Sequence, residues 1–213
     1  MVSLDAWTRQ HVAPVAKEAG LTRKGLVYRL AADNGDHALL EFRARRLDPA
    51  MEVFTVKAYV VPAASWAWSY RKSWESARKK APDASAAIVQ WGVIPPEQAA
   101  YEPDNVNPLN PNWAYGGRID PDAAGQAMAE VLREHTLPTM RRLLDRDALF
   151  TEICSPSFEF HRGRPPGWAR MILRVDEATP AELEELVGQV ETSYPVVDEF
   201  IAWARTRAAE HNG

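Results

Sequence analysis

Residues 26–45 read LVYRLAADNGDHALLEFRAR, two alternating runs of apolar and polar residues on either side of Asp33-Asn34-Gly35-Asp36. The Asn-Gly dipeptide strongly favours a tight turn between antiparallel strands, because both residues adopt positive φ readily. A third alternating run follows at 53–61. The sequence therefore predicts three consecutive antiparallel strands over about 26–30, 38–45 and 53–61.

Alternation along these strands assigns their side chains to two faces of the sheet, because successive residues of a strand point in opposite directions. The apolar face collects Tyr28, Leu30, Leu40, Phe42, Ala44, Phe54, Val56, Ala58 and Val60. The charged face collects Arg29, Glu41, Arg43, Arg45, Thr55, Lys57 and Tyr59. Such a sheet packs helices on its apolar face and turns the charged face to water or to a ligand.

The other elements expected before residue 120 lie on either side of this three-stranded unit. Apolar spacing of three and four predicts a helix over 4–19, ended by Gly20. Two further strands are expected at 86–94 and 113–119, separated by a proline-rich loop. Residues 65–80 are expected to form a solvent-exposed insertion, in part a short helix.

From Asp120 the apolar spacing changes to that of helices. We expect a helix from Asp120 that bends at Pro138, a short helix over 147–153, and, after a break at Ser193-Tyr194-Pro195, a last helix to about Glu210. Thr179-Pro180-Ala181-Glu182 is a capping box that predicts a helix to about Val190. Residues 168–175 are expected to add a late strand.

These elements predict one α+β domain over residues 1–213. Its parts are an N-terminal helix, an antiparallel sheet of about five strands, and C-terminal helices packed on one sheet face. Residues 156–213 form a helical C-terminal extension of that domain.

Composition limits the class of protein. The chain has 213 residues, of which 46% are hydrophobic and 25% charged, values typical of a folded globular domain. Its one cysteine, Cys154, cannot form an internal disulfide. No signal peptide and no apolar run of membrane length is evident in the sequence. We therefore expect a cytoplasmic protein without a membrane partner.

Charge is distributed unevenly along the chain. Residues 1–80 carry 14 Lys and Arg against 8 Asp and Glu, a net charge of +6, while residues 81–213 carry 11 against 21, a net charge of −10. A basic amino-terminal part favours anionic partners, although acidic helices within the same fold can also neutralise it. The overall pI of 5.8 argues against a dedicated nucleic-acid-binding protein, which usually has a basic domain.

A cluster of aromatic and basic residues at 66–74 is the first candidate interaction surface. It consists of Trp66, Trp68, Tyr70, Arg71 and Trp74. Aromatic and arginine side chains are enriched in protein interfaces and in stacking platforms. The alternative is that these rings cover the end of the sheet and exclude water from it.

The charged sheet face is the second candidate site, formed by Arg29, Glu41, Arg43, Arg45, Lys57 and Tyr59. A carboxylate among cations stays ionised and can orient an anionic ligand. For an enzyme, Arg29, Arg43 and Lys57 would hold the anion and Glu41 would act as the base. Cross-strand ion pairs on a solvated face account for the same residues.

No specific catalytic or metal-binding motif is found. The five histidines never occur in a two-ligand spacing, and the sequence has no C-x-x-C pair. Cys154 and His161 could serve as nucleophile and base, but the Cys-Ser-Pro context favours a buried, inert cysteine. We therefore expect no catalytic residue, no metal and no cofactor.

Several short motifs resemble the bacterial domain-of-unknown-function family 4304. They are Leu21-Thr22-Arg23-Lys24-Gly25 before a strand with Tyr28-Arg29, Phe54-Thr55-Val56 in the third strand, and Leu137-Pro138 before a short capped helix at Asp147. The resemblance covers roughly residues 5–155. It implies an α+β fold on an antiparallel sheet and, since the family has no established activity, no mechanism.

Two functions follow as expectations. The first is a non-enzymatic cytoplasmic interaction protein, for example of the immunity type that covers a toxin, which would use residues 66–74 to bind a protein partner. The second is an enzyme or binding domain that holds a small anionic or nucleotide-like ligand on the charged sheet face. Neither oligomeric state nor pathway follows from the sequence.

Overall fold

The computed structural model describes residues 2–108, 110–155, 161–162 and 164–212. Its sheet is built on the predicted hairpin, in which β2 (Val27–Ala31) pairs with β3 (His37–Arg45) and β3 pairs with β4 (Met51–Val61). Gly35 has a φ of 81° in the turn, as the Asn-Gly dipeptide predicts. Glu41 lies opposite Lys57, so the predicted charged face is present at this register.

The remaining strands complete a sheet of seven strands among the described residues. β5 (Val89–Gly92) and β6 (Asn112–Gly116) both pair with β4, and β1 (Thr22–Lys24) and β7 (His161–Arg162) extend its edges. All pairs are antiparallel. The loop between β5 and β6 contains two 3-10 turns, Glu97–Ala99 and Pro103–Asn105. The α+β class, the N-terminal helix and the antiparallel sheet are confirmed.

The N-terminal helix is divided in two, as α1 (Leu4–His11) and α2 (Ala13–Glu18). Pro14 lies in the first turn of α2, where its missing N–H costs no intrahelical hydrogen bond. Gly20 has a φ of 82°, the left-handed conformation expected just after a helix end. One predicted helix is therefore two consecutive ones.

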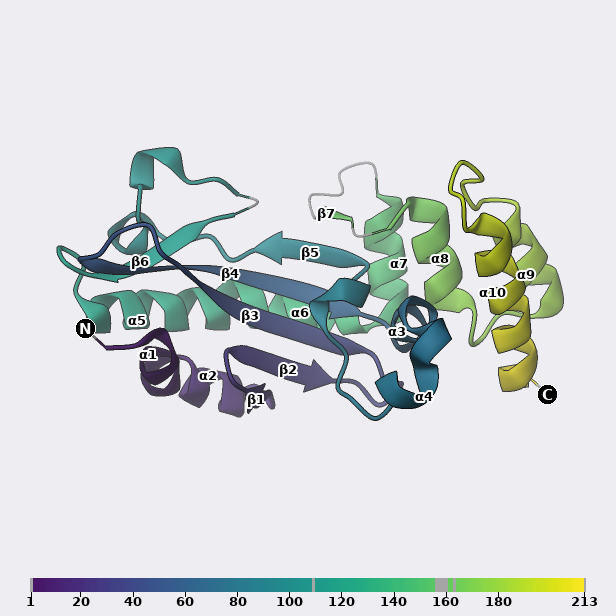
Figure 1. The fold of residues 1–213 in the computed structure, drawn as a ribbon, viewed down its shortest axis with the longest axis horizontal. Helices are drawn as coiled ribbons and strands as arrows, with labels where there is room; N and C mark the ends of the chain where they lie inside the picture. Colours follow the sequence, from purple (N-terminus) through teal and green to yellow (C-terminus); the bar gives the residue numbers. More distant parts are fainter. Residues whose placement is uncertain (1, 109, 156–160, 163, 213) are drawn as a thin grey trace.

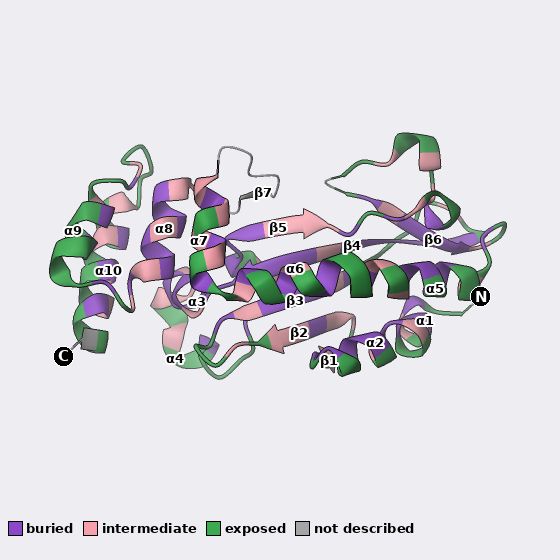
Figure 2. Ribbon diagram, turned by 180° about the vertical axis from the view of Figure 1, so that it is seen from behind, coloured by how far each residue is buried: buried purple, intermediate pink, exposed green. Residues whose placement is uncertain are grey.

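A long helical segment covers the apolar face of the sheet. It runs through α5 (Pro121–Val131), a π-helical turn (Leu132–Thr136) and α6 (Leu137–Leu144). The sequence predicts a bend at Pro138, whereas the irregularity in the structure is the π-helical turn before it, and the helix continues through Pro138. Because Pro138 has no N–H to donate, the preceding turn widens and the helix continues beyond it. Figure 2 shows this segment lying along the sheet.

The main core lies between this sheet face and the helices. It contains rings from β2, β3, β4 and β6 packed against Trp7 of α1 and Met128 of α5. Its largest fully buried side chains include Trp7, Trp113, Tyr28, Tyr115, Phe42 and Phe54. The residues assigned to the apolar face by the period-two pattern are buried or half-buried, except Ala44, which is exposed.

The last helices gather at one end of the sheet (Figure 1). They are α7 (Arg146–Cys154), α8 (Pro166–Arg174), α9 (Pro180–Val187) and α10 (Val197–Asn212). The predicted capping box at Thr179 and Glu182 is present. The strand predicted at 168–175 is wrong, since this stretch forms α8. Trp168, Met171 and Ile172 lie at helical spacing, and Ala169 and Leu173 are buried as well, so most of the circumference of α8 is buried.

The segment predicted as a solvent-exposed insertion is instead part of the core. It forms α3 (Ala63–Ser69), a 3-10 turn (Arg71–Ser73) and α4 (Trp74–Ala77), followed by a further 3-10 turn (Ala84–Ala86). Trp66 and Trp68 are buried. Trp66 packs with Leu39, Tyr59 and Val61 over one end of the charged face. No helix in the described part of the chain is long and apolar enough to cross a membrane.

Candidate functional site

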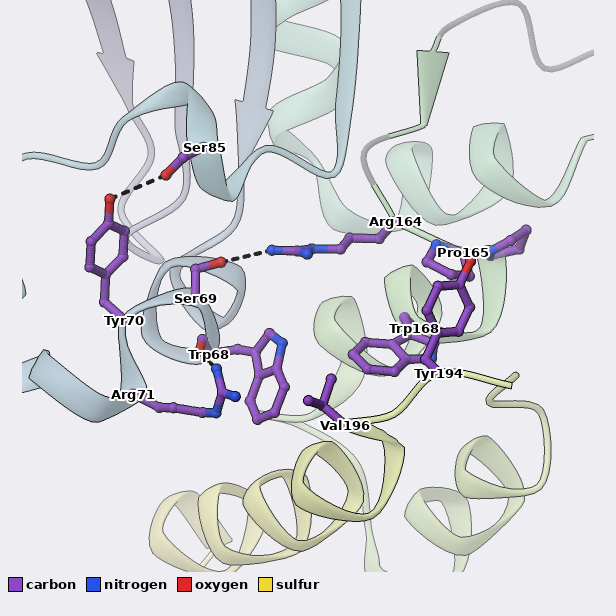
Figure 3. A pocket seen from close by; sticks show the side chains of 11 residues that line it. Trp68, Ser69, Tyr70, Arg71, Ser85, Arg164, Pro165, Trp168, Tyr194 and Val196 are labelled. Carbon is purple, nitrogen blue, oxygen red and sulfur yellow. Dashed lines mark hydrogen bonds between the residues drawn. The ribbon is translucent and has the colours of Figure 1, made fainter. Parts of the chain in front are cut away.

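A cavity of about 910 Å³ lies where three parts of the chain meet (Figure 3). α3 and the turn after it form one wall, residues 164–168 at the start of α8 form the second, and the segment before α10 forms the third. Its lining residues are Trp68, Ser69, Tyr70, Arg71, Ser85, Arg164, Pro165, Pro166, Trp168, Tyr194 and Val196. The volume lies within the range of small-molecule sites.

Trp68 and Arg71 form the first wall as a stacked pair. Trp68 is 3% exposed, and the Arg71 guanidinium carbon lies 3.7 Å from the centre of its ring. Helical spacing places Arg71 one turn after Trp68, and its Nη1 donates to the Trp68 carbonyl oxygen at 3.1 Å. Arg71 also holds both carboxylate oxygens of Glu199 on α10, at 2.7 and 2.8 Å. The wall is therefore tied to the last helix.

Arg164 brings a second cation to the cavity. Its Nη2 donates to Ser69 Oγ at 2.9 Å, and its buried Nε has no hydrogen-bond partner in the described part of the chain. No described carboxylate lies within ion-pair distance of it. Burial and the nearby Arg71 lower the pKa of Arg164 from its usual value. An anion would stabilise this guanidinium, because buried charges are normally paired.

The second and third walls carry aromatic and apolar side chains. Trp168 stacks on Phe200 with ring centres 4.1 Å apart and an interplanar angle of 2°. Tyr194 meets Trp168 edge to face at 5.7 Å. Tyr194 is 46% exposed and Val196 40% exposed, so apolar surface at the third wall stays in contact with water.

The chemistry of the lining favours recognition over proton transfer. The cavity is lined by two arginines, four hydroxyl groups, aromatic rings, prolines and a valine, with no Asp, Glu, His or Cys among the described lining residues. Tyr70 is already hydrogen-bonded through its hydroxyl to Asp83 and Ser85. No lining group is placed as a general base or as an activated nucleophile.

The structure brings together part of the predicted aromatic cluster. Trp68, Tyr70 and Arg71 line the cavity. Trp66 lies behind it, with its ring 4.1 Å from that of Tyr70, and covers the sheet as the alternative reading expects. Trp74 is half-buried in the same cluster and does not line the cavity. The expectation of an exposed aromatic surface is wrong, because these rings pack against the sheet and the last helices.

Sequence reasoning missed the residues of the other two walls. Arg164, Trp168, Tyr194 and Val196 lie about 90 to 130 positions after Trp68 in the chain. The Arg-Pro-Pro-Gly-Trp stretch at 164–168 was the available signal, since an arginine and a tryptophan flank two prolines there. Nothing local in the sequence indicated that this stretch meets α3.

The charged sheet face is open at one end only. Arg43 Nη2 binds Glu41 Oε2 at 2.8 Å, and Lys57 and Arg45 have no ion pair among the described residues. Tyr59 is 4% exposed, so its placement on an open face is wrong: residues 63–88 cover that part. Burial next to Glu41 raises the pKa of Tyr59 to about 12.

Arg29, at the other side of this face, is half-buried, and its Nε donates to the Pro82 carbonyl oxygen at 3.4 Å. Arg29 therefore contacts the segment 63–88, which covers this part of the sheet, and takes no part in the Glu41–Arg43 ion pair. No group of three or more potential metal ligands is found in the part of the chain that the structure describes. Cys154 is half-buried, and the side chain of His161 lies outside the described residues.

Comparison of the chain with models of known protein families, with curated proteins and with solved structures gives no match. The resemblance to family 4304 stays a prediction from the motifs quoted above. The cavity between α3, α8 and α10 is therefore the feature on which a function is argued.

Proposed function

We propose that the protein binds a small anionic ligand in the cavity between α3, α8 and α10, without chemical conversion. The observation that carries the proposal is Arg164, a cation whose Nε is buried without a hydrogen-bond partner and which no described carboxylate neutralises. A carboxylate or phosphate group would supply both the missing acceptor and the missing charge.

The neighbouring groups support an anion at this place. Ser69 Oγ fixes the Arg164 guanidinium, and Arg71 adds a second positive charge in the same cavity. Glu199 already pairs with Arg71 through both carboxylate oxygens, so the charge that no described carboxylate neutralises is that of Arg164. The ordered guanidinium groups also need little reorganisation when the ligand enters, which favours affinity.

The sequence-based hypotheses are narrowed by this geometry. An interaction protein of the immunity type would present exposed aromatic residues to its partner, whereas Trp66 and Trp68 are buried. The sequence also predicts an anionic ligand on the charged sheet face, but Arg43 there is already paired with Glu41. We therefore place the anionic ligand in the cavity and not on the charged sheet face. The single cysteine supports a cytoplasmic location.

The test is calorimetric titration of the purified full chain with inorganic phosphate, phenyl phosphate and benzoate. Arg164→Gln removes the charge, and Arg133→Gln removes an exposed arginine that does not line the cavity, as a matched control. A charge-assisted hydrogen bond contributes about 1.5–3 kcal/mol, so Arg164→Gln should weaken binding by roughly tenfold or more. Arg133→Gln should bind like the native protein.

Two results would overturn the proposal. One is that none of the three anions binds to the native protein. The other is that an anion binds equally well to the native protein and to Arg164→Gln, which would place its site elsewhere. Circular dichroism of each variant shows whether the fold is retained, and Arg164→Lys, which keeps the charge, provides a second variant with intermediate affinity expected.

A further inference from the structure

We infer that the anionic group of the ligand is attached to an aromatic ring, which stacks on the exposed wall formed by Tyr194 and Val196. This inference rests on the proposed function and specifies the class of ligand. It follows from the part of the cavity that an anion alone leaves unfilled.

The first argument is size. The cavity has a volume of about 910 Å³, whereas a bare phosphate or carboxylate would fill only the corner beside Arg164 and Ser69. Sites of this size generally hold ligands with an apolar body and a few polar anchors. The remaining space therefore suits an attached apolar group.

The second argument is the exposed apolar surface. Among the described residues, large apolar side chains at least 40% exposed are few, namely Val2, Leu47, Ile94, Tyr194 and Val196. Two of these, Tyr194 and Val196, line the same cavity as the arginines. Covering this surface with an apolar group releases its water and favours binding.

The third argument is the geometry of the rings. Phe200 takes one face of Trp168, and Arg71 lies over Trp68. Tyr194 meets Trp168 edge to face, and such a contact takes up at most one face of the Tyr194 ring, so the other face is left by this contact for stacking. Figure 3 shows Arg164 directed toward Ser69, while Trp168, Tyr194 and Val196 lie on the side of α10. The unpaired charge of Arg164 and the exposed apolar surface of Tyr194 and Val196 thus line one cavity.

The experiment compares the affinities of inorganic phosphate, phenyl phosphate, benzoate and phenol for the full chain by calorimetry. One additional aromatic contact should make phenyl phosphate bind roughly two- to tenfold more tightly than inorganic phosphate. Phenol, which has the ring without the charge, should bind more weakly than phenyl phosphate. Benzoate against phenyl phosphate distinguishes a carboxylate from a phosphate as the preferred anionic group.

Substitutions at Tyr194 test whether this residue causes the tighter binding of phenyl phosphate relative to inorganic phosphate. Tyr194→Ala should remove most of the difference between phenyl phosphate and inorganic phosphate, while Tyr194→Phe, which retains the ring, should preserve it. Leu47→Ala, at an exposed apolar residue outside the cavity, serves as the control and should change nothing.

The outcomes separate this inference from the proposed function. If phenyl phosphate binds no more tightly than inorganic phosphate, or if Tyr194→Ala keeps the full gain, the aromatic inference is wrong. The proposed function still stands in that case, provided that inorganic phosphate binding depends on Arg164. If no anion binds, both are wrong.

Discussion

Arg146 and Asp36, 110 positions apart, form a buried ion pair with two hydrogen bonds, from Nε to Oδ2 at 2.8 Å and from Nη2 to Oδ1 at 2.9 Å. Their side chains are 8% and 3% exposed. Asp36 also accepts from the backbone N–H of Ala63, and Arg146 lies 3.6 Å from Asp176. The pair therefore joins the hairpin turn, the start of α3, α7 and the connection between α8 and α9.

Arg146→Ala should lower the free energy of unfolding by about 3–5 kcal/mol, because it leaves the buried Asp36 carboxylate without its counter-charge. Urea unfolding at neutral pH measures the change. Arg142→Ala is the control: its pair with Glu152 is partly exposed, at 48% and 25% of the two side chains, and its loss should cost less than about 1 kcal/mol. Equal losses in the two variants would contradict the structural role given to Arg146.

Glu199→Gln should strengthen binding of anions in the cavity. The Glu199 carboxylate now occupies the guanidinium of Arg71, where it competes with an anionic ligand. For a partly exposed pair we expect roughly a two- to fivefold gain in affinity for phenyl phosphate, and a smaller gain at high salt. Calorimetry at two salt concentrations measures both.

Glu184→Gln is the matched control for this prediction. Glu184 binds Arg205 through both oxygens, at 2.8 and 2.7 Å, outside the cavity between α3, α8 and α10. It should leave anion affinity unchanged. The competition would be excluded if the two glutamine variants bound phenyl phosphate equally.

His37 should make the protein less stable as the pH falls. Burial, reinforced by Arg29, lowers the pKa of His37 below its ordinary value, and Asp36 only partly offsets this. Between this lowered pKa and the value near 6.5 in the unfolded chain, the unfolded state binds more protons, so stability falls as pH decreases through that interval.

The measurement is urea unfolding of the native protein and of His37→Gln at pH 7.5 and pH 5. The native protein should lose more stability over this interval than His37→Gln does, because the glutamine does not titrate. An equal loss in both proteins would show that other groups govern the pH dependence.

Gly167→Ala should destabilise the attachment of α8. A Cβ atom at this position would overlap the Gln189 carbonyl oxygen and lie 2.8 Å from Glu191 Oε2. Since a backbone atom must shift, we expect a loss of about 1–3 kcal/mol in thermal or urea unfolding. Gly188→Ala meets nothing closer than 3.4 Å at a φ of −63°, and should be neutral or stabilising by about 0.5 kcal/mol.

Local pattern is sufficient to predict the central antiparallel strands and insufficient to predict the cavity. Asn34-Gly35 and the alternation on either side of it specify a hairpin whose partners are neighbours in the chain. At 168–175 the apolar residues form a nearly continuous run, which a buried strand and a buried helix share, so the pattern alone did not decide between them.

Tyr59 illustrates a second limit of prediction from local sequence, which is that alternation assigns a face of the sheet but not whether that face is covered. Its placement on the polar face of β4 was correct by alternation, but whether that face is covered depends on where residues 63–88 fold back. In the same way Trp68 and Arg71 could be selected as binding residues from their types, whereas their partners Arg164 and Tyr194 are brought to them by tertiary packing alone. Non-local packing determines both outcomes.

The three-walled cavity has a consequence for local unfolding. Since its walls belong to α3 on one side and to α8 and the segment before α10 on the other, release of the last helices from the sheet destroys the site. A bound ligand therefore opposes that release by mass action, by about 2.7 kcal/mol at a ligand concentration a hundred times Kd. Backbone amides of α9, which does not line the cavity, would then exchange with deuterium more slowly when the cavity is occupied.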